Sequence, residues 1–141
     1  MTPEVLARRL HAKSSEYLAK ITKELANVEK LWISFDGWDS TYQGMSIYGF
    51  YAYFINQNFE RKRVFLCVRR IDGKADSVKI GELVVQTLKD FSLDTSKVVG
   101  ALCDGARNIT SCLDRNGWFH VHCFAHTLSL SSSRSSAKRL K

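Results

Sequence analysis

The sequence has 141 residues, of which 45% are hydrophobic and 11% aromatic, so we expect one domain with an apolar core. Its apolar runs are far shorter than the roughly 20 residues that cross a bilayer, and it opens on a polar helical stretch rather than a signal peptide. These features exclude an integral membrane protein, a collagen and a disordered chain, and we expect no membrane partner. The four cysteines do not suggest the disulfide framework of a small secreted domain, which favours a reducing intracellular compartment.

The net charge of +7 suggests a polyanionic partner, but its distribution weakens that suggestion. Residues 131–141 carry four basic and no acidic side chains, which is +4. Residues 1–30 carry six basic and four acidic side chains (+2), and the hundred residues between carry eleven and ten (+1). The central part of the chain is therefore nearly neutral, and most of the excess lies in a Ser-rich tail.

Residues 3–30 are predicted to form one amphipathic helix, because leucine, isoleucine and valine recur at spacings of three and four. After this helix we expect strands over 31–36, 45–55, 61–70, 98–103 and 118–123, and helices over 78–91, 106–114 and from 125 onward. Ser77 is the expected cap of the second helix. The continuous apolar run 98–103 predicts a strand buried on both faces.

The order of these elements predicts an α/β fold. The first three strands follow one another closely enough to form an antiparallel meander, and the later strands require crossover connections through helices. The result is a mixed five-stranded sheet with flanking helices, preceded by the amphipathic N-terminal helix.

Two predicted strands run into an aspartate that is followed by glycine, at Asp36 and at Asp104. If these strands are neighbours, both carboxylates lie at one edge of the sheet, where open α/β sheets place their sites. Two close carboxylates repel unless a cation joins them, and Mg²⁺ accepts one or two carboxylates together with phosphate oxygens. Two such ions support phosphodiester cleavage. The alternative is that each Asp-Gly is only a turn after a strand.

A second group of candidate residues is formed by His120, His122, Cys123 and His126. The two first histidines alternate with apolar residues, so they would share one face of a strand. Cys123 and His126 have the spacing of half a zinc site, but no second pair completes four ligands, so zinc is not expected. His126 could instead reach a phosphate at the sheet edge, and the alternative is a partly buried histidine with a local hydrogen bond.

Trp38, two residues past Asp36, could stack on a nucleic-acid base, although core packing is favoured by spacing alone. The strand 61–70 has basic ends that could follow a phosphate backbone. A solvated edge strand kept from aggregating by charge explains these basic residues equally well.

Taken together, three segments resemble the catalytic domain of hAT-superfamily DNA transposases and their domesticated relatives with BED zinc fingers. The segments are LWISFDGWDS, CDGARNIT and WFHVHCFAHTLSL, and the similarity covers roughly residues 5–130. They contain Asp-x-Trp after the first strand, Asp-x-x-x-Asn ending at Asn108, and Cys-x-x-His before Leu-x-Leu.

This resemblance implies an RNase H-like fold and metal-dependent cleavage and transfer of transposon-end DNA in the nucleus, with Mg²⁺ or Mn²⁺ as cofactor. It implies that Asp36 and Asp104 are two catalytic, metal-binding carboxylates and that His126 lies beside the scissile phosphate. It also implies that Trp38, Cys123 and Asn108 lie near the DNA. No small-molecule substrate is expected.

The resemblance is incomplete. The third catalytic acid of the family is a glutamate that follows a long helical insertion, and this chain ends before it, so the final helix is expected to be missing as well. We therefore expect an N-terminal helix (1–30), a partial, truncated RNase H-like domain (31–130) and a disordered basic tail (131–141). Negligible cleavage by the chain alone is predicted, which leaves open whether it is an enzyme.

Two other functions remain open from the sequence. A domesticated relative could serve as a DNA- or chromatin-binding module without catalysis, and a partner chain such as a full-length transposase could supply the missing acid. Because one sheet face lacks its last helix, exposed apolar surface is expected, together with aggregation, self-association or dependence on a partner.

Overall fold

The computed structural model describes residues 2–40 and 44–129, so the predicted tail 131–141 lies outside the described part of the chain. The elements in chain order are α1 (Pro3–Ala26), β1 (Leu31–Ser40), β2 (Met45–Ile55), β3 (Arg61–Asp72), α2 (Ser77–Asp90), a short 3₁₀ turn (Thr95–Lys97), β4 (Val98–Cys103), α3 (Arg107–Arg115) and β5 (Phe119–His122). Residues 124–129 are again helical.

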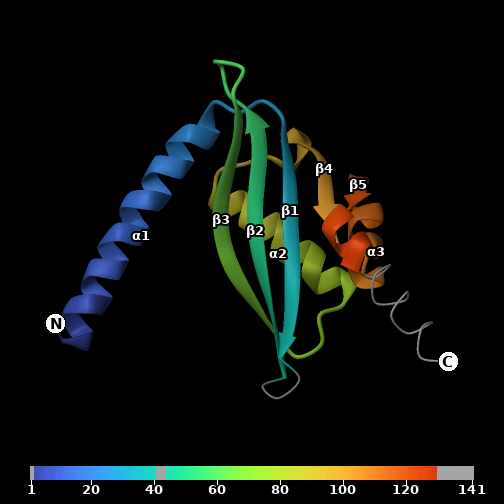
Figure 1. The fold of residues 1–141 in the computed structure, drawn as a ribbon, viewed down its shortest axis with the longest axis horizontal. Coiled ribbons are helices and arrows are strands. Elements are labelled where there is room, and N and C mark those ends of the chain that lie inside the picture. The colour runs from blue at the N-terminus through green and yellow to red at the C-terminus, as the bar shows by residue number, and fades with distance from the viewer. Residues whose placement is uncertain (1, 41–43, 130–141) are drawn as a thin grey trace.

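The five strands form one mixed sheet in the order β3-β2-β1-β4-β5 (Figure 1). β1, β2 and β3 pair antiparallel, whereas β4 pairs parallel with β1, and β5 pairs parallel with β4. Parallel neighbours need a crossover, which α2 and α3 supply. This strand order with these directions is RNase H-like, and the predicted α/β fold is confirmed.

The meander forms because its strands alternate between apolar and solvent-facing positions with the period of a pleated strand. In β2, five alternate side chains are buried: Ser46, Tyr48, Phe50, Ala52 and Phe54. β1 matches this pattern over its first half with Leu31, Ile33 and Phe35. The buried side of the sheet is thus specified by side-chain alternation.

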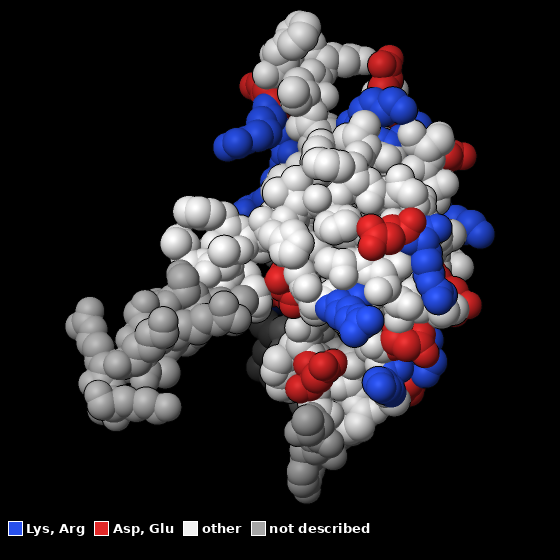
Figure 2. Space-filling model, turned by 90° about the vertical axis from the view of Figure 1, so that its right-hand side faces the viewer, with Lys and Arg blue, Asp and Glu red and all other residues white. Residues whose placement is uncertain are grey.

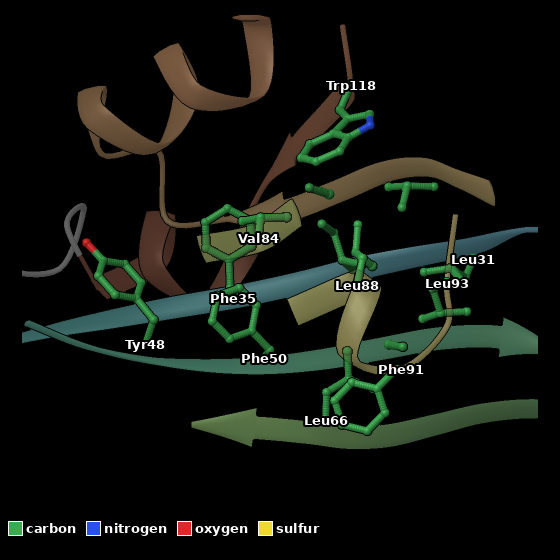
Figure 3. Close-up of a cluster of buried hydrophobic side chains, with 14 of the residues drawn as sticks. Leu31, Phe35, Tyr48, Phe50, Leu66, Val84, Leu88, Phe91, Leu93 and Trp118 are labelled. Carbon is green, nitrogen blue, oxygen red and sulfur yellow. The ribbon is translucent and has the colours of Figure 1, made fainter. Parts of the chain in front are cut away.

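The core lies between this buried side and helices α2 and α3. The rings of Phe35 and Phe50 stack with centroids 5.5 Å apart, and Val84 and Leu88 of α2 point toward them (Figure 3). Asp76 caps α2 by accepting hydrogen bonds from the backbone N–H groups of Val78 and Lys79, so the prediction of Ser77 as the cap is wrong. Ser77 is already the first residue of the helix.

Helix α1 lies beside the edge strand β3 and diverges from it toward the N-terminus (Figure 1). Ile21 and Leu25 are buried, and the Tyr17 hydroxyl donates a hydrogen bond to the Phe65 carbonyl of β3 at 3.2 Å. Leu6 and Leu10, in the diverging half, are 48% and 62% exposed. The C-terminal half therefore anchors the helix, and the N-terminal half leaves its apolar side in solvent.

The other side of the sheet is open, and Figure 1 looks onto it, with β1–β3 in front of α2. We call it the open face: the side chains of the strands that point away from α2, among them Trp32, Asp36, Trp38, Tyr51, Tyr53, Phe65, Val68, Phe119 and Val121. Phe119 is 65% exposed and Val99 is 40% exposed. Apolar surface is therefore exposed as expected, and β4 is buried as predicted except at Val99, which lies where its register with β1 shifts, and at Leu102, which is half-buried.

Strand β1 is longer than predicted and continues through Asp36 to Ser40. Pairing with β2 holds this extension in place, from Asp36 opposite Gly49 to Ser40 opposite Met45. Asp36-Gly37 is therefore part of a strand and not a turn. Within the described residues, no helix is both long and apolar enough to cross a membrane.

Candidate active site

The register of the sheet brings together Asp36, on β1, and Asp104, the first residue after the neighbouring parallel strand β4. β1 and β4 pair as far as Ser34 opposite Leu102, and two further residues along each strand lead to Asp36 and Asp104. Adjacent strands lie about 4.8 Å apart. Asp36 is exposed and Asp104 is half-buried. The two carboxylates predicted from the sequence are thus brought to the same edge of the sheet.

The loop after β4 fixes the position of Asp104. One carboxylate oxygen, Oδ1, accepts a hydrogen bond from the backbone N–H of Ala106 at 2.8 Å. Gly105 between them has φ +84°, a left-handed conformation that glycine adopts without strain. Here the Asp-Gly pair does form a turn, and that turn leaves the second carboxylate oxygen for a ligand.

The pKa of Tyr48 is affected by the negative charges at this end of the sheet. Its ring lies against Gly37, where an added Cβ would be 2.4 Å from the Tyr48 Cε1 atom. Burial, together with the negative charges of Asp39, Asp104 and Asp36, raises the pKa of Tyr48 to about 12. Three carboxylates therefore act on one phenol, and Tyr48 stays neutral under ordinary conditions.

Asp39 does not join Asp36 and Asp104 in a three-carboxylate site. It lies three residues beyond Asp36 on β1, and its Oδ1 accepts a hydrogen bond from the Ser46 hydroxyl at 2.5 Å. Strand alternation points Asp36 and Asp39 to opposite faces of the sheet. In the part of the chain that the structure describes, no group of three or more His, Cys, Asp or Glu side chains is arranged to hold a metal ion.

Trp38 shares the open face with Asp36, two residues away on the same strand. Its side chain is 62% exposed, so the core packing that spacing alone favoured is wrong. A large aromatic ring left in solvent beside a carboxylate offers a flat surface for a ligand.

Asn108 has a structural task in addition to any contact with a ligand. Its Nδ2 donates a hydrogen bond to the Ala75 carbonyl at 3.0 Å, which ties the start of α3 to the loop before α2. Asn108 also borders a shallow hollow of about 380 Å³ that is lined by Asp39, Ser46 and Lys74 among others. A DNA contact through this amide would compete with the hydrogen bond to Ala75.

Cys123 and His126 follow β5 at the start of the helical residues 124–129. The Cys123 backbone N–H donates to the Cys103 carbonyl at 2.6 Å, and its own carbonyl accepts a hydrogen bond from the Thr127 N–H. The thiol is half-buried and free, whereas His126 is exposed. These hydrogen bonds anchor the segment to the end of β4, one residue before Asp104.

The histidine that contacts the Asp104 loop is His122. Cys103 pairs with His122 across β4 and β5, and the imidazole lies against Gly105, where an added Cβ would be 2.5 Å from Nδ1. From the sequence, His122 belongs to a group of three histidines and a cysteine, of which His126 is the residue predicted to lie at the site. His122 can be identified as a neighbour of the Asp104 loop only from the parallel register of β4 and β5, which a single sequence does not reveal.

His120 lies on the same strand face as His122, as the alternation predicted, with ring centroids 6.0 Å apart. Its Nδ1 is 3.7 Å from an Asp114 oxygen of α3. The half-buried His120 therefore has a nearby acidic side chain at the end of α3.

Three of the five basic residues at the ends of β3 have an acidic partner, and a fourth, Arg63, lies over the Tyr51 ring. Lys62 pairs with Glu60 at 2.9 Å, Arg70 pairs with Asp72 at 2.6 Å, and Arg69 forms an ion pair with Asp90 of α2. β3 is an edge strand, so these residues fit the solvated-edge interpretation better than a phosphate-binding path. Figure 2 shows the side of the molecule to the right of Figure 1, where acidic and basic side chains are interspersed without a continuous basic area.

The two aspartates fit a hard divalent cation such as Mg²⁺ or Mn²⁺. Such ions prefer oxygen ligands and bind through one or two carboxylates plus phosphate oxygens. Asp36 is exposed, and Asp104 has one oxygen outside the loop hydrogen bond. The donor set is thus suitable for one ion but smaller than two closely spaced ions require.

Comparisons with known proteins add little to this description. No protein-family profile and no curated protein matches the sequence. Two solved structures of NurA, one of them bound to dAMP and manganese, share 15% and 14% identity with this chain. Each alignment covers 76% of this chain and 29% of the NurA chain, with a TM-score of 0.25. The RNase H-like class of this chain therefore rests on its own strand order and directions.

Proposed function

We propose that residues 31–130 belong to the catalytic domain of a DNA-processing enzyme of the hAT transposase type. The observation that carries the proposal is that Asp36 on β1 and Asp104 just after β4 lie at the same end of two neighbouring parallel strands in an RNase H-like sheet. Transposon-end DNA in the nucleus is the proposed substrate. The resemblance of the three quoted segments to hAT transposases supports the type of enzyme. The fold supports a site at the end of the sheet where Asp36 and Asp104 lie.

In this proposal each residue has a distinct task. Asp36 and Asp104 would hold Mg²⁺ or Mn²⁺, and such an ion would supply charge stabilisation and an activated water for phosphodiester cleavage. Trp38 offers its exposed ring to a base beside the cleaved bond. The segment from Cys123 to His126, tethered to the Cys103 carbonyl, carries the histidine that contacts the DNA backbone.

We further propose that the chain by itself does not cleave DNA. Asp36 and Asp104 are two carboxylates, and the described residues provide no third acid beside them, since Asp39 is bonded to Ser46 on the other face. With an incomplete ligand set the ion is bound weakly and positioned poorly. Incubation with Mn²⁺ and terminal-repeat DNA should yield no product, and cleavage that disappears in Asp36→Ala would refute this point.

Metal binding tests the site independently of cleavage. Titration of the full chain with Mn²⁺, followed by electron paramagnetic resonance of the free ion, should show one weak site. Asp36→Ala and Asp104→Ala should each abolish that site, whereas Asp72→Ala, which removes an exposed acid paired with Arg70, should leave it unchanged. Binding that survives both site substitutions would overturn the proposal that these two aspartates form the metal site.

A DNA- or chromatin-binding module without catalysis is the second candidate. It is favoured by the polar groups near the site that already have internal partners: Asp104 bonds Ala106, and Asn108 bonds Ala75. Such a module would bind DNA weakly, with an affinity that falls as salt rises and is the same with or without Mn²⁺. Metal-dependent cleavage restored by adding a full-length relative would instead favour an enzyme that is completed by a partner chain.

A further inference from the structure

The loop of residues 104–106, which joins β4 to α3, is anchored at both of its ends. At its start, Cys103 is buried in the core, and its carbonyl accepts the hydrogen bond from the Cys123 N–H. At its end, the Ala106 carbonyl accepts two hydrogen bonds from the first turn of α3. The residue between these anchors is Gly105, and glycine has more backbone freedom than any other residue. The shape of the loop therefore depends on what restrains this glycine.

The ring of His122 packs against Gly105. β4 and β5 pair in parallel, and the pairing of Cys103 with His122 brings the imidazole to the start of the loop. A Cβ atom added to Gly105 would lie 2.5, 2.7 and 3.6 Å from the Nδ1, Cε1 and Cγ atoms of this ring, and these are its three nearest atoms outside the adjacent residues. The imidazole thus fills the space that a side chain at position 105 would take. A flat, rigid ring in this place limits the backbone rotations of the glycine.

The conformation of Gly105 in turn determines how the Asp104 carboxylate is held. Oδ1 of Asp104 accepts its 2.8 Å hydrogen bond from the Ala106 N–H across the glycine, whose φ is +84°. Rotation of Gly105 away from this left-handed conformation would move the Ala106 N–H and break the bond. The carboxylate would then lose its fixed orientation. Residues that orient a metal ligand without binding the metal commonly control the affinity of a metal site.

We propose that His122 is a positioning residue for Asp104: its ring holds the turn at Gly105 and so keeps the second Asp104 oxygen available at the sheet end where Asp36 lies. The inference rests on the proposed function, in which these two aspartates hold a divalent cation. His122 acts through the loop and not as a ligand. Its sheet partner Cys103 is buried on the helix side, and paired residues point to the same side, whereas Asp36 belongs to the open face.

His120 provides a matched comparison on the same strand. It shares the strand face of His122, with ring centroids 6.0 Å apart, but its Nδ1 is 3.7 Å from an Asp114 oxygen of α3. Replacing either histidine by alanine removes an imidazole from β5, whereas only the substitution of His122 removes the ring that packs against Gly105. If His122 served only the stability of β5, both substitutions would leave the Asp104 turn intact.

Hydrogen exchange of the Ala106 amide, measured by nuclear magnetic resonance on the full chain without metal, tests the positioning directly. This N–H is protected while it bonds Asp104. His122→Ala should abolish the protection, whereas His122→Phe, which keeps a flat ring, and His120→Ala should retain it. Thermal unfolding shows that each variant is folded, and because His122 is exposed its replacement leaves no buried cavity. Protection that persists in His122→Ala, or that is lost in His122→Phe or His120→Ala as well, would overturn the proposal.

Titration of the same variants with Mn²⁺, followed by electron paramagnetic resonance of the free ion, measures the consequence for the cation. His122→Ala should weaken binding by about tenfold, whereas His122→Phe and His120→Ala should bind as the parent does. If the parent binds no Mn²⁺, the metal site of the proposed function is refuted, and the Ala106 exchange still decides whether His122 holds the turn. If His122→Ala loses the Ala106 protection but binds Mn²⁺ as tightly as the parent, the ring does not serve the cation site and the inference is overturned.

Discussion

Replacing Gly100 by alanine is expected to destabilise the sheet where β4 meets β5. An added Cβ would lie 2.8 Å from the Phe119 carbonyl oxygen, and 2.8 and 2.9 Å from two carbons of the Trp32 ring. Comfortable contacts between such atoms begin near 3.5 Å. The Phe119 oxygen belongs to the backbone of the paired strand, so it cannot move without disturbing the pairing of Gly100 with Phe119.

Overpacking of this kind costs about 1–3 kcal/mol in the free energy of unfolding. Gly49 of β2 is the matched control, because it is also a strand glycine but an added Cβ there meets nothing within 4 Å. Gly49→Ala should stabilise the protein by about 0.4–1 kcal/mol through the lower entropy of the unfolded chain. The two variants should therefore differ by about 1.4–4 kcal/mol.

Urea unfolding followed by far-ultraviolet circular dichroism measures this difference, with the slope of the transition checking that both variants unfold as the parent does. Because β5 leads directly to Cys123, whose N–H bonds the Cys103 carbonyl, Gly100→Ala should also perturb the segment carrying His126. Equal midpoints for Gly100→Ala and Gly49→Ala would refute the register of β4 and β5 and the position of the Trp32 ring.

Three further predictions concern the site and the helix that supports it. The pKa of Tyr48 is raised from about 10 to about 12, so between these pH values the folded state keeps a proton that the unfolded state loses. The free energy of unfolding should therefore fall by about 1–2 kcal/mol as pH rises from 10 to 12. Urea midpoints compared across this range should show the fall in the parent but not in Tyr48→Phe. Gly105→Ala and Gly117→Ala each place alanine at a positive φ, which should lower the free energy of unfolding by about 1–2 kcal/mol. Gly105→Ala should lower it further, because only its Cβ meets the His122 ring. Adding His122→Ala to Gly105→Ala should remove this additional loss. Asp76→Ala should lower the melting temperature because it removes the cap of α2, whereas Ser77→Ala should not. The hydrogen bond from the Lys79 N–H lowers the pKa of Asp76. The higher melting temperature of the parent should therefore be present above pH 3.8 and be lost as pH falls through the lowered pKa of Asp76.

Much of the fold could be predicted from local patterns because those patterns match local forces. Residues 45–55 were predicted as a strand from their β-type residues and residues 98–103 from a continuous apolar run, and β2 and β4 have these bounds in the structure. The boundary of β1 was missed because Asp36, Gly37 and Ser40 are poor strand formers individually. Pairing with β2 overrides those weak local preferences.

The candidate site could be predicted only in part. Asp36 and Asp104 were identified because each follows an apolar run, and their adjacency needed only the assumption that β1 and β4 are neighbours. The roles of Trp38 and His122 depend on which way a side chain points across a long-range pairing. Spacing assigned Trp38 to the core, whereas the uncovered face leaves it exposed.

The sequence by itself determined the order of helices and strands, the near neutrality of the central hundred residues and the two acids that follow apolar strands. Only the tertiary structure decided that Lys62, Arg69 and Arg70 of β3 pair with acids, that His122 lies on the Asp104 loop, and that the open face and half of α1 stay in solvent. The reason is physical: helical and strand periodicity arise from neighbours along the chain, whereas ion pairing, ring contacts and burial depend on residues far apart in sequence that the sheet register brings together.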